Sequence, residues 1–208
     1  MTMKRFLLLF SFFATVIGHP VSAQISIGAG YLKTQASGAY KNVSGDGFYA
    51  GLSYRIPLNG SFSLVPGLFF TRTNEQLQQS LTSSFRTDDN CVEKALLASV
   101  QMQWGVNLSS RVRAFLYAGP SFQFGLQCQV PSGVNNQQQN LYVTSLYGPS
   151  RQCWNVWAGG GAGISLPILS RYRLFVIGGW DYGLVNLYSD PGYKSHRSLW
   201  KVGAGFEF

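Results

Sequence analysis

The last nine residues of the chain, Trp200-Lys201-Val202-Gly203-Ala204-Gly205-Phe206-Glu207-Phe208, decide the fold class. Their even-numbered positions are apolar or aromatic, and the positions between them are small or charged. Alternation with a period of two places these two sets on opposite faces of a β-strand. In a soluble domain this strand would leave an open edge and an exposed aromatic end. In a membrane-spanning barrel, the apolar face contacts lipid and the polar face lines the lumen.

The amino-terminal residues have the pattern of an export signal. Two basic residues precede the apolar stretch 6–18, which is too short to span a bilayer as a helix. Val21-Ser22-Ala23 is typical of a cleavage site with small residues. We therefore predict a signal peptide over residues 1–23 and a mature domain over residues 24–208.

The composition excludes several classes of protein. Charged residues make up 12% of the chain, about half the usual globular share of ~25%. The basic residues form no run, so the net charge of +8 does not predict nucleic-acid binding. After the signal peptide, no apolar stretch reaches the ~18 residues of a spanning helix. A membrane protein of this composition must span as a closed β-barrel, which satisfies every backbone group internally.

Eight segments of the mature chain alternate in polarity. They are residues 24–32, 47–55, 62–71, 92–106, 112–122, 154–166, 172–182 and 197–208. Their connections alternate between tight turns (56–61, 107–111 and 167–171) and long polar loops (33–46, 72–91, 125–153 and 183–196). Short turns at one end and long loops at the other are typical of an outer-membrane barrel, with both termini at the periplasmic end. Pro66 and Pro120 fall inside two segments, where we expect bulges or early strand ends.

From the second segment onward, the even-numbered side chains are predicted to face lipid. Aromatic residues at these positions gather at two levels, as the two water–lipid interfaces require. The predicted girdle contains Tyr54, Phe62, Trp104, Tyr172, Phe206 and Phe208 at the periplasmic level, and Trp154 and Trp180 at the extracellular level. Gly-Ala-Gly occurs at 28–30, 161–163 and 203–205, with the glycines at lumen positions, where they would make room for long side chains of facing strands.

These features together resemble the small eight-stranded outer-membrane β-barrel family, in particular the porin-family outer-membrane β-barrel domain of Bacteroidetes type. The resemblance covers the whole mature chain and rests on the signal peptide, strand count, loop asymmetry and terminal Phe208. It implies an all-β fold, an eight-stranded antiparallel up-and-down transmembrane barrel in the bacterial outer membrane. It also implies contact with outer-membrane lipid and recognition of the C-terminal strand by the barrel-assembly machinery. A soluble lipocalin-like periplasmic carrier is the alternative, but it does not explain the loop asymmetry or the bare Phe208.

Charged residues at lumen positions are predicted to form ion pairs. A turn at Asp190-Pro191-Gly192 brings residues whose numbers sum to about 381 opposite each other in the last hairpin. This register predicts the pairs Arg173–Glu207 and Asp181–Lys201, because unpaired charges in a narrow lumen are costly. Arg55 and Arg113 lie at a similar depth on other strands and could join the Arg173–Glu207 pair. Such a network would act as a plug or as a selectivity filter.

Three cysteines lie at the extracellular side of the predicted barrel. Export into an oxidising compartment favours one disulfide and one free thiol. Cys128–Cys153 would close the longest loop and is the preferred pair, while Cys91 and Cys128 are nearly equidistant from the turn 107–111 and form the alternative. We expect no metal site, because His196 has no partner at metal-ligand spacing.

The sequence predicts no catalytic residues and no cofactor. His196-Arg197-Ser198 resembles the His-x-Ser arrangement of outer-membrane lipid A deacylases, but no carboxylate on that face could orient the histidine. An interior about filled by side chains excludes a wide pore. We expect a structural, surface-binding or narrow-channel role, with the loop 125–153 available for an extracellular protein or glycan.

Overall fold

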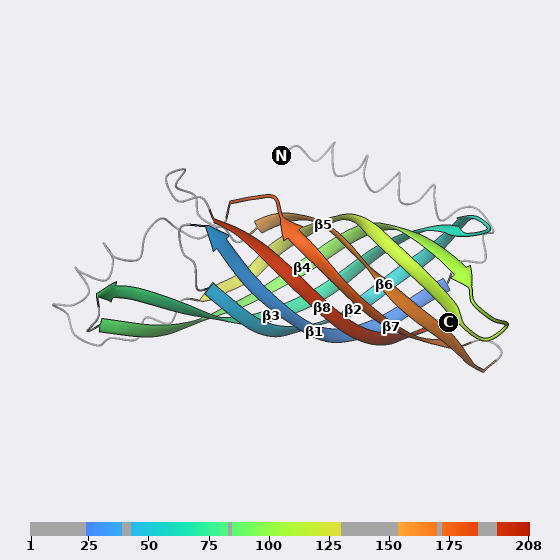
Figure 1. The fold of residues 1–208 in the computed structure, drawn as a ribbon, viewed down its shortest axis with the longest axis horizontal. Coiled ribbons are helices and arrows are strands. Elements are labelled where there is room, and N and C mark those ends of the chain that lie inside the picture. Colours follow the sequence, from blue (N-terminus) through green and yellow to red (C-terminus); the bar gives the residue numbers. More distant parts are fainter. Residues whose placement is uncertain (1–23, 39–42, 83–84, 130–153, 170–171, 187–194) are drawn as a thin grey trace.

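The computed structural model describes residues 24–38, 43–82, 85–129, 154–169, 172–186 and 195–208. They form eight strands in a closed antiparallel barrel in which each strand pairs with the next and β8 pairs with β1 (Figure 1). The strands are β1 (Gln24–Gly38), β2 (Val43–Asn59), β3 (Phe62–Thr82), β4 (Phe85–Asn107), β5 (Arg113–Gln129), β6 (Trp154–Leu169), β7 (Tyr172–Gly183) and β8 (Ser195–Glu207). The described residues contain no helix long and apolar enough to cross a membrane. The predicted fold class is therefore confirmed, while the signal peptide lies outside the described residues.

The strands continue well past the segments that alternation identifies. β3 and β4 have 21 and 23 residues and pair from Phe62↔Trp104 to Thr82↔Phe85. The predicted loop 72–91 is thus wrong, because nearly all of it is a hairpin, which projects from the end of the barrel opposite the C-terminus (Figure 1). The physical reason is that both faces of a strand meet water beyond the membrane. The apolar alternation then ends although the backbone hydrogen bonds continue.

The outward face follows the predicted alternation. From β2 onward, every exposed large apolar side chain among the described residues is even-numbered, as in Leu52, Leu116 and Val176. In β1 the odd positions Ile25 and Ile27 face outward instead. Register shifts occur at four places, all close to strand ends or to the extracellular rim. The membrane-spanning part of the sheet therefore keeps one inside and one outside face.

The two prolines produce neither bulges nor strand ends, so that prediction is wrong. Pro66 stays opposite Val100, and Pro120 stays opposite Ala158. On the other side of each proline, toward β2 for Pro66 and toward β4 for Pro120, two residue pairs are missing from the ladder. The pairing then resumes in the same register. Proline has no N–H to donate. The long flanking ladders hold the strands together across each interruption.

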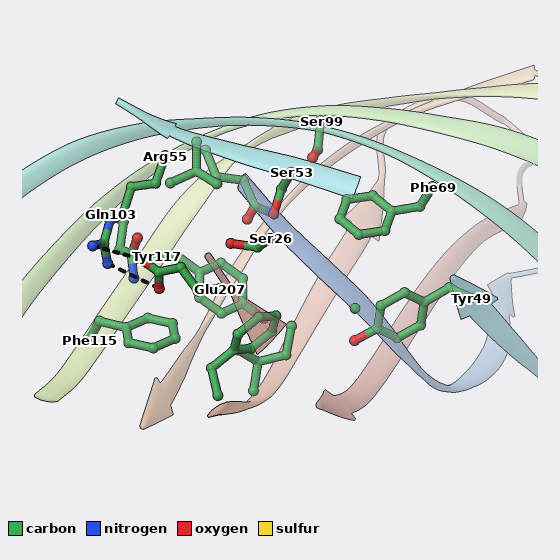
Figure 2. A pocket seen from close by; sticks show the side chains of 15 residues that line it. Ser26, Tyr49, Ser53, Arg55, Phe69, Ser99, Gln103, Phe115, Tyr117 and Glu207 are labelled. Carbon is green, nitrogen blue, oxygen red and sulfur yellow. Dashed lines mark hydrogen bonds and ion pairs between the residues drawn. The ribbon is translucent and has the colours of Figure 1, made fainter. Parts of the chain in front are cut away.

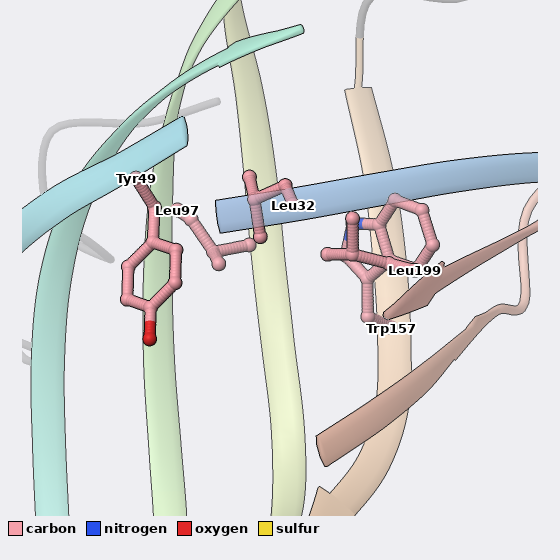
Figure 3. Close-up of a cluster of buried hydrophobic side chains, with 5 residues drawn as sticks. All are labelled: Leu32, Tyr49, Leu97, Trp157 and Leu199. Atoms are coloured by element: carbon pink, nitrogen blue, oxygen red, sulfur yellow. The ribbon is translucent and has the colours of Figure 1, made fainter. Parts of the chain in front are cut away.

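Apolar side chains fill the middle of the lumen. Five strands contribute one buried residue each to a cluster of Leu32, Tyr49, Leu97, Trp157 and Leu199 (Figure 3). Lumen glycines give the larger rings their space, as predicted. A Cβ on Gly30 would lie 2.6 Å from Cε1 of Tyr49. The barrel consequently has a packed core instead of an open pore, as its small strand number requires.

Candidate functional site

The lumen carries three layers of charged or polar residues, one above the other. The extracellular layer is centred on Arg197 of β8, whose side chain is 4% exposed. Its guanidinium forms ion pairs with Glu75 of β3 and, at 3.0 Å, with Glu93 of β4. Both carboxylates are at most 2% exposed. This layer therefore joins strands on opposite sides of the barrel.

Neighbouring side chains complete the extracellular layer. Gln123 donates a hydrogen bond to Glu93 and accepts one of 2.9 Å from the indole N–H of Trp157. Thr34 donates to Glu75 at 3.1 Å. The arginine also lies over the Trp157 ring, 5.8 Å from its centroid. Together with these carboxylate, aromatic and amide neighbours, Arg197 fills the cross-section of the lumen and connects the strands around it.

Local sequence explains how Glu75 reaches so far across the barrel. Gly45 of β2 lies opposite Glu75 in the register, between it and β1. A Cβ at Gly45 would lie 2.5 Å from Cγ of Glu75 and 2.6 Å from Oγ1 of Thr34. The missing side chain therefore opens the path by which the carboxylate crosses β2. Sequence reasoning missed this layer because Glu75 fell in a predicted loop. Its signal was the shared odd parity of Glu75, Glu93 and Arg197.

The middle layer is the ion pair Asp181–Lys201. Nζ of Lys201 lies 2.7 Å from Oδ2 of Asp181, and the two residues are 7% and 2% exposed. The structure thus brings together the two residues that the sequence pairs. Asp181 lies directly opposite Leu199, so the ion pair runs diagonally between β7 and β8. The ammonium also lies 5.3 Å from the ring centroid of Tyr117.

The periplasmic layer contains one carboxylate and three guanidinium groups. Glu207 forms its ion pair with Arg55 of β2, at 2.7 Å, and not with Arg173. Arg173 lies directly opposite Glu207 in the register, yet it forms no ion pair with any described residue. The predicted Arg173–Glu207 pair is therefore wrong. The physical reason is that Arg55 lies two strands from Glu207, and Ser26, the β1 residue opposite Glu207, is small enough to leave the long arginine side chain a path across β1 to the carboxylate.

Arg113 belongs to the same layer. Its guanidinium lies over Gly105 of β4, where a Cβ would be 2.6 Å from Nη2. Its charge interacts with those of Glu207 and Arg173. Ser165 of β6 lies opposite Arg113 of β5 on one side, and on the other side opposite Phe175 of β7, two residues from Arg173.

A cavity of about 90 Å³ separates the periplasmic layer from the aromatic middle of the barrel. Its lining contains the polar side chains of Arg55, Glu207 and Gln103 and the rings of Tyr49 and Tyr117, with Tyr49 on the side away from Arg55 (Figure 2). The two gaps in strand pairing beside Pro66 and Pro120 both border the cavity. Its lining includes Arg55 and Val65 at the first gap and Gln101 at the second. The cavity ends at the packed middle of the lumen and does not continue to the extracellular side.

The predicted girdle residues lie on the outward face of the barrel. Exposure is 41–53% for seven of them, and Tyr54 is partly buried. The seven are Phe62, Trp104, Trp154, Tyr172, Trp180, Phe206 and Phe208. Several form ring contacts across strands, such as Tyr172 with Phe208 at 5.5 Å and Trp180 with Trp200 at 6.3 Å.

His196 and Ser198 also lie near the extracellular rim, where each contacts a backbone carbonyl group. Ser198 donates a hydrogen bond of 3.4 Å to the carbonyl oxygen of Gln35. Nδ1 of His196 lies 3.2 Å from the carbonyl oxygen of Gly183, and the imidazole stacks on Tyr182. Within the described part of the chain, no group of three or more His, Cys, Asp or Glu side chains is placed to hold a metal ion.

The structure describes the backbone positions of two of the three cysteines. The backbone places Cys91 opposite Glu75, and Cys128 opposite Glu93. Cys91 and Cys128 are therefore two positions apart on the neighbouring strands β4 and β5. Cys153 lies outside the described residues, so the Cys128–Cys153 pair stays a prediction.

Comparison with solved structures finds other small outer-membrane proteins. The chain is similar to neisserial surface protein A (17% identity, TM-score 0.48, 88% of this chain and 95% of that chain). It is also similar to OprG of Pseudomonas aeruginosa (11% identity, TM-score 0.49, 92% and 98% of the two chains). A third similar structure is Ail of Yersinia pestis in complex with the heparin analogue sucrose octasulfate (16% identity, TM-score 0.46, 89% and 99%). No curated protein matches the chain.

A family model matches most of the sequence. The outer membrane protein beta-barrel domain matches residues 18–189, which include β1 to β7. This match agrees with the closed barrel, its apolar outer face and its two levels of aromatic residues. The chain belongs to the family of the outer membrane protein beta-barrel domain, and its place is the bacterial outer membrane.

Proposed function

We propose that this protein acts at the extracellular surface, as a non-conducting barrel that presents its hairpins and loops to an extracellular protein or glycan. The observation that carries the proposal is the closed lumen. Arg197 and its two carboxylate partners close the extracellular part of the lumen. The apolar cluster around Trp157 closes its middle. Meanwhile, the β3–β4 hairpin continues far beyond the barrel. Ions and solutes thus have no route through the lumen, whereas the hairpin presents a large surface outside the barrel.

The β3–β4 register allows a sharp test of surface binding. Leu77 lies opposite Asp89, so residues 78–88 can be replaced by Asn-Gly without changing the pairing below them. A second variant shortens the connection 130–153 between β5 and β6, and a control carries residues 78–88 in scrambled order. Cells producing each variant are compared in wells coated with heparin. We expect binding by the intact protein, loss of it in at least one shortened variant, and equal amounts of heat-modifiable barrel in the outer membrane. Unchanged binding in both shortened variants would contradict the proposal.

The narrow channel is the competing function, and conductance separates the two. We expect purified barrels in planar bilayers to show no discrete openings. Steady, ion-selective openings that change in Lys201→Met would instead establish a channel controlled by the middle layer.

We further propose that the protein is not an enzyme. The contacts of Ser198 and His196 with backbone carbonyl groups support this, because a nucleophile needs a base within hydrogen-bond reach. Lipid A from cells producing the intact protein should match that from cells producing Ser198→Ala. Fewer acyl chains in the first sample alone would refute the proposal.

Finally, we propose that the assembly machinery recognises β8 through its apolar outward face. Phe206 and Phe208 are each 48% exposed on that face. Phe208→Ala should lower the amount of barrel in the outer membrane, whereas Leu58→Ala, outside β8, should not. Equal insertion of all three proteins would count against a role for the terminal ring.

A further inference from the structure

The periplasmic layer of the lumen has more positive than negative charge. It contains the guanidinium groups of Arg55, Arg113 and Arg173, and the carboxylate of Glu207. Glu207 is paired with Arg55 at 2.7 Å (Figure 2). Arg113 and Arg173 form no ion pair with any described residue, although both are only partly exposed. Two cations therefore remain uncompensated in a confined space, where their mutual repulsion is less screened than in bulk water.

Buried polar atoms without partners lie at the same place. Of the four side-chain nitrogen or oxygen atoms in the described residues that are buried and lack a hydrogen bond, three belong to this layer, Nε of Arg173, Oγ of Ser165 and Oε1 of Glu207, and the fourth is Nε of Arg197 in the extracellular layer. Ser165 is 1% exposed and lies opposite Arg113 in the register. Since nearly all buried polar groups in proteins have a partner, such atoms mark a place where a small polar ligand or ordered water binds.

A cavity adjoins the inner side of this layer, although Arg113, Arg173 and Ser165 do not line it. The cavity of about 90 Å³ borders the layer through Arg55, Glu207, Phe115 and Phe175. Roughly 10–15 Å³ of such space admits one water molecule, so the cavity can hold several waters or one small ion. Its floor at Tyr49 and Tyr117 is closed by the packed middle of the barrel. A ligand that enters from the periplasmic end therefore meets the arginine layer before it reaches the cavity.

From the two unpaired arginines and the unpartnered buried atoms we infer that the periplasmic end of the lumen contains a binding site for a small oxyanion, such as sulfate or phosphate, that opens toward the periplasm. Arg113 and Arg173 bind the anion with charge-assisted hydrogen bonds, which planar guanidinium groups form well with oxyanions. Ser165 donates its hydroxyl proton to one anion oxygen. The Arg55–Glu207 pair stays intact and limits the site on the cavity side. Binding neutralises repulsion between the two arginines and gives the two orphaned atoms their partners.

Titration calorimetry tests this site on the full chain, exported by cells and purified from outer membranes in an uncharged detergent. Sodium sulfate and sodium phosphate are titrated at constant ionic strength against sodium chloride. We expect saturable binding that weakens at least about tenfold in Arg113→Gln/Arg173→Gln, because a single hydrogen bond to a charged group contributes that much or more. Arg111→Gln is the matched control. It removes an exposed cation from the adjacent turn and should change the affinity less than about twofold.

Two further results decide the proposal if the double variant folds poorly. Ser165→Ala keeps every charge and removes only a hydroxyl group, so it should fold normally and still weaken binding severalfold. In addition, the double variant should unfold at no lower temperature than the parent when oxyanions are absent, since it relieves repulsion. Absence of saturation in the parent would overturn the inference. So would binding that Arg111→Gln weakens as much as the double variant, which would indicate non-specific attraction to a basic surface.

Discussion

We predict that the ion pair Asp181–Lys201 contributes strongly to the stability of the barrel, because it is buried and has few neighbours that could replace either partner. Its atoms are 2.7 Å apart, and both residues are at most 7% exposed. Removing one partner of such a pair leaves an uncompensated charge and costs about 3–5 kcal/mol. Asp181→Asn should therefore lower the free energy of unfolding by that amount, since the ammonium keeps only the nearby Tyr117 ring.

The double variant Asp181→Asn/Lys201→Met gives the prediction its specificity. Replacing both charged partners by residues of similar volume is often neutral or stabilising, because no buried ion remains to be desolvated. The double variant should thus lie within about 1 kcal/mol of the parent, and the coupling energy should exceed about 2 kcal/mol. Lys33→Met, an exposed lysine on the outer side of β1, should change stability by less than ~0.5 kcal/mol.

Equilibrium unfolding in urea, with the barrel in lipid vesicles, measures the free energies of the parent, of the single variants Asp181→Asn and Lys201→Met, of the double variant and of the control Lys33→Met. The mobility of unboiled samples on a denaturing gel gives an independent count of folded barrels. Losses below about 1 kcal/mol in Asp181→Asn would refute a buried, desolvated pair. So would costs that simply add in the double variant, because additivity means that the two side chains do not interact.

Three further predictions concern other parts of the barrel. Trp157→Ala should destabilise the protein by about 3–5 kcal/mol through loss of a 1%-exposed ring, as measured by the same unfolding assay. Val176→Lys, in the middle of the lipid-facing band, should cost about 2–4 kcal/mol, whereas Leu58→Lys near the periplasmic rim should cost about 0–1 kcal/mol; equal costs would contradict the assigned membrane position. Mass spectrometry of unreduced peptides should find Cys128 linked to Cys153, and a peptide linking Cys128 to another cysteine would disprove that pairing.

The sequence predicts the spanning part of this barrel well because lipid imposes a strict rule there. Every outward side chain must be apolar, so alternation locates the strands and their faces, as at Leu52 and Val176. Outside the membrane both faces of a strand meet water. The rule then disappears, and the β3–β4 hairpin is indistinguishable from a polar loop although its ladder continues to Thr82.

Charge pairing is predictable only as far as register is predictable. The sequence predicts that facing residues of the last hairpin have numbers that sum to about 381. The observed sum is 380, as for Arg173 and Glu207, so the predicted register is off by a single residue. That accuracy suffices for Asp181 and Lys201, since long side chains also meet diagonally. It does not suffice for Glu207, because the choice between Arg55 and Arg173 depends on side-chain reach across β1 and not on hairpin register.

The same reasoning explains why the lumen is charged at all. A barrel in lipid cannot place ionised side chains on its outer face at mid-membrane depth, so they must point inward. Eight strands leave an interior that side chains nearly fill, and buried charges must then find partners. Arg197 with two carboxylates and Lys201 with one satisfy this requirement in the upper lumen. The periplasmic layer departs from it with two unpaired arginines, and this local departure in an otherwise compensated interior is the reason to assign an external anion to it.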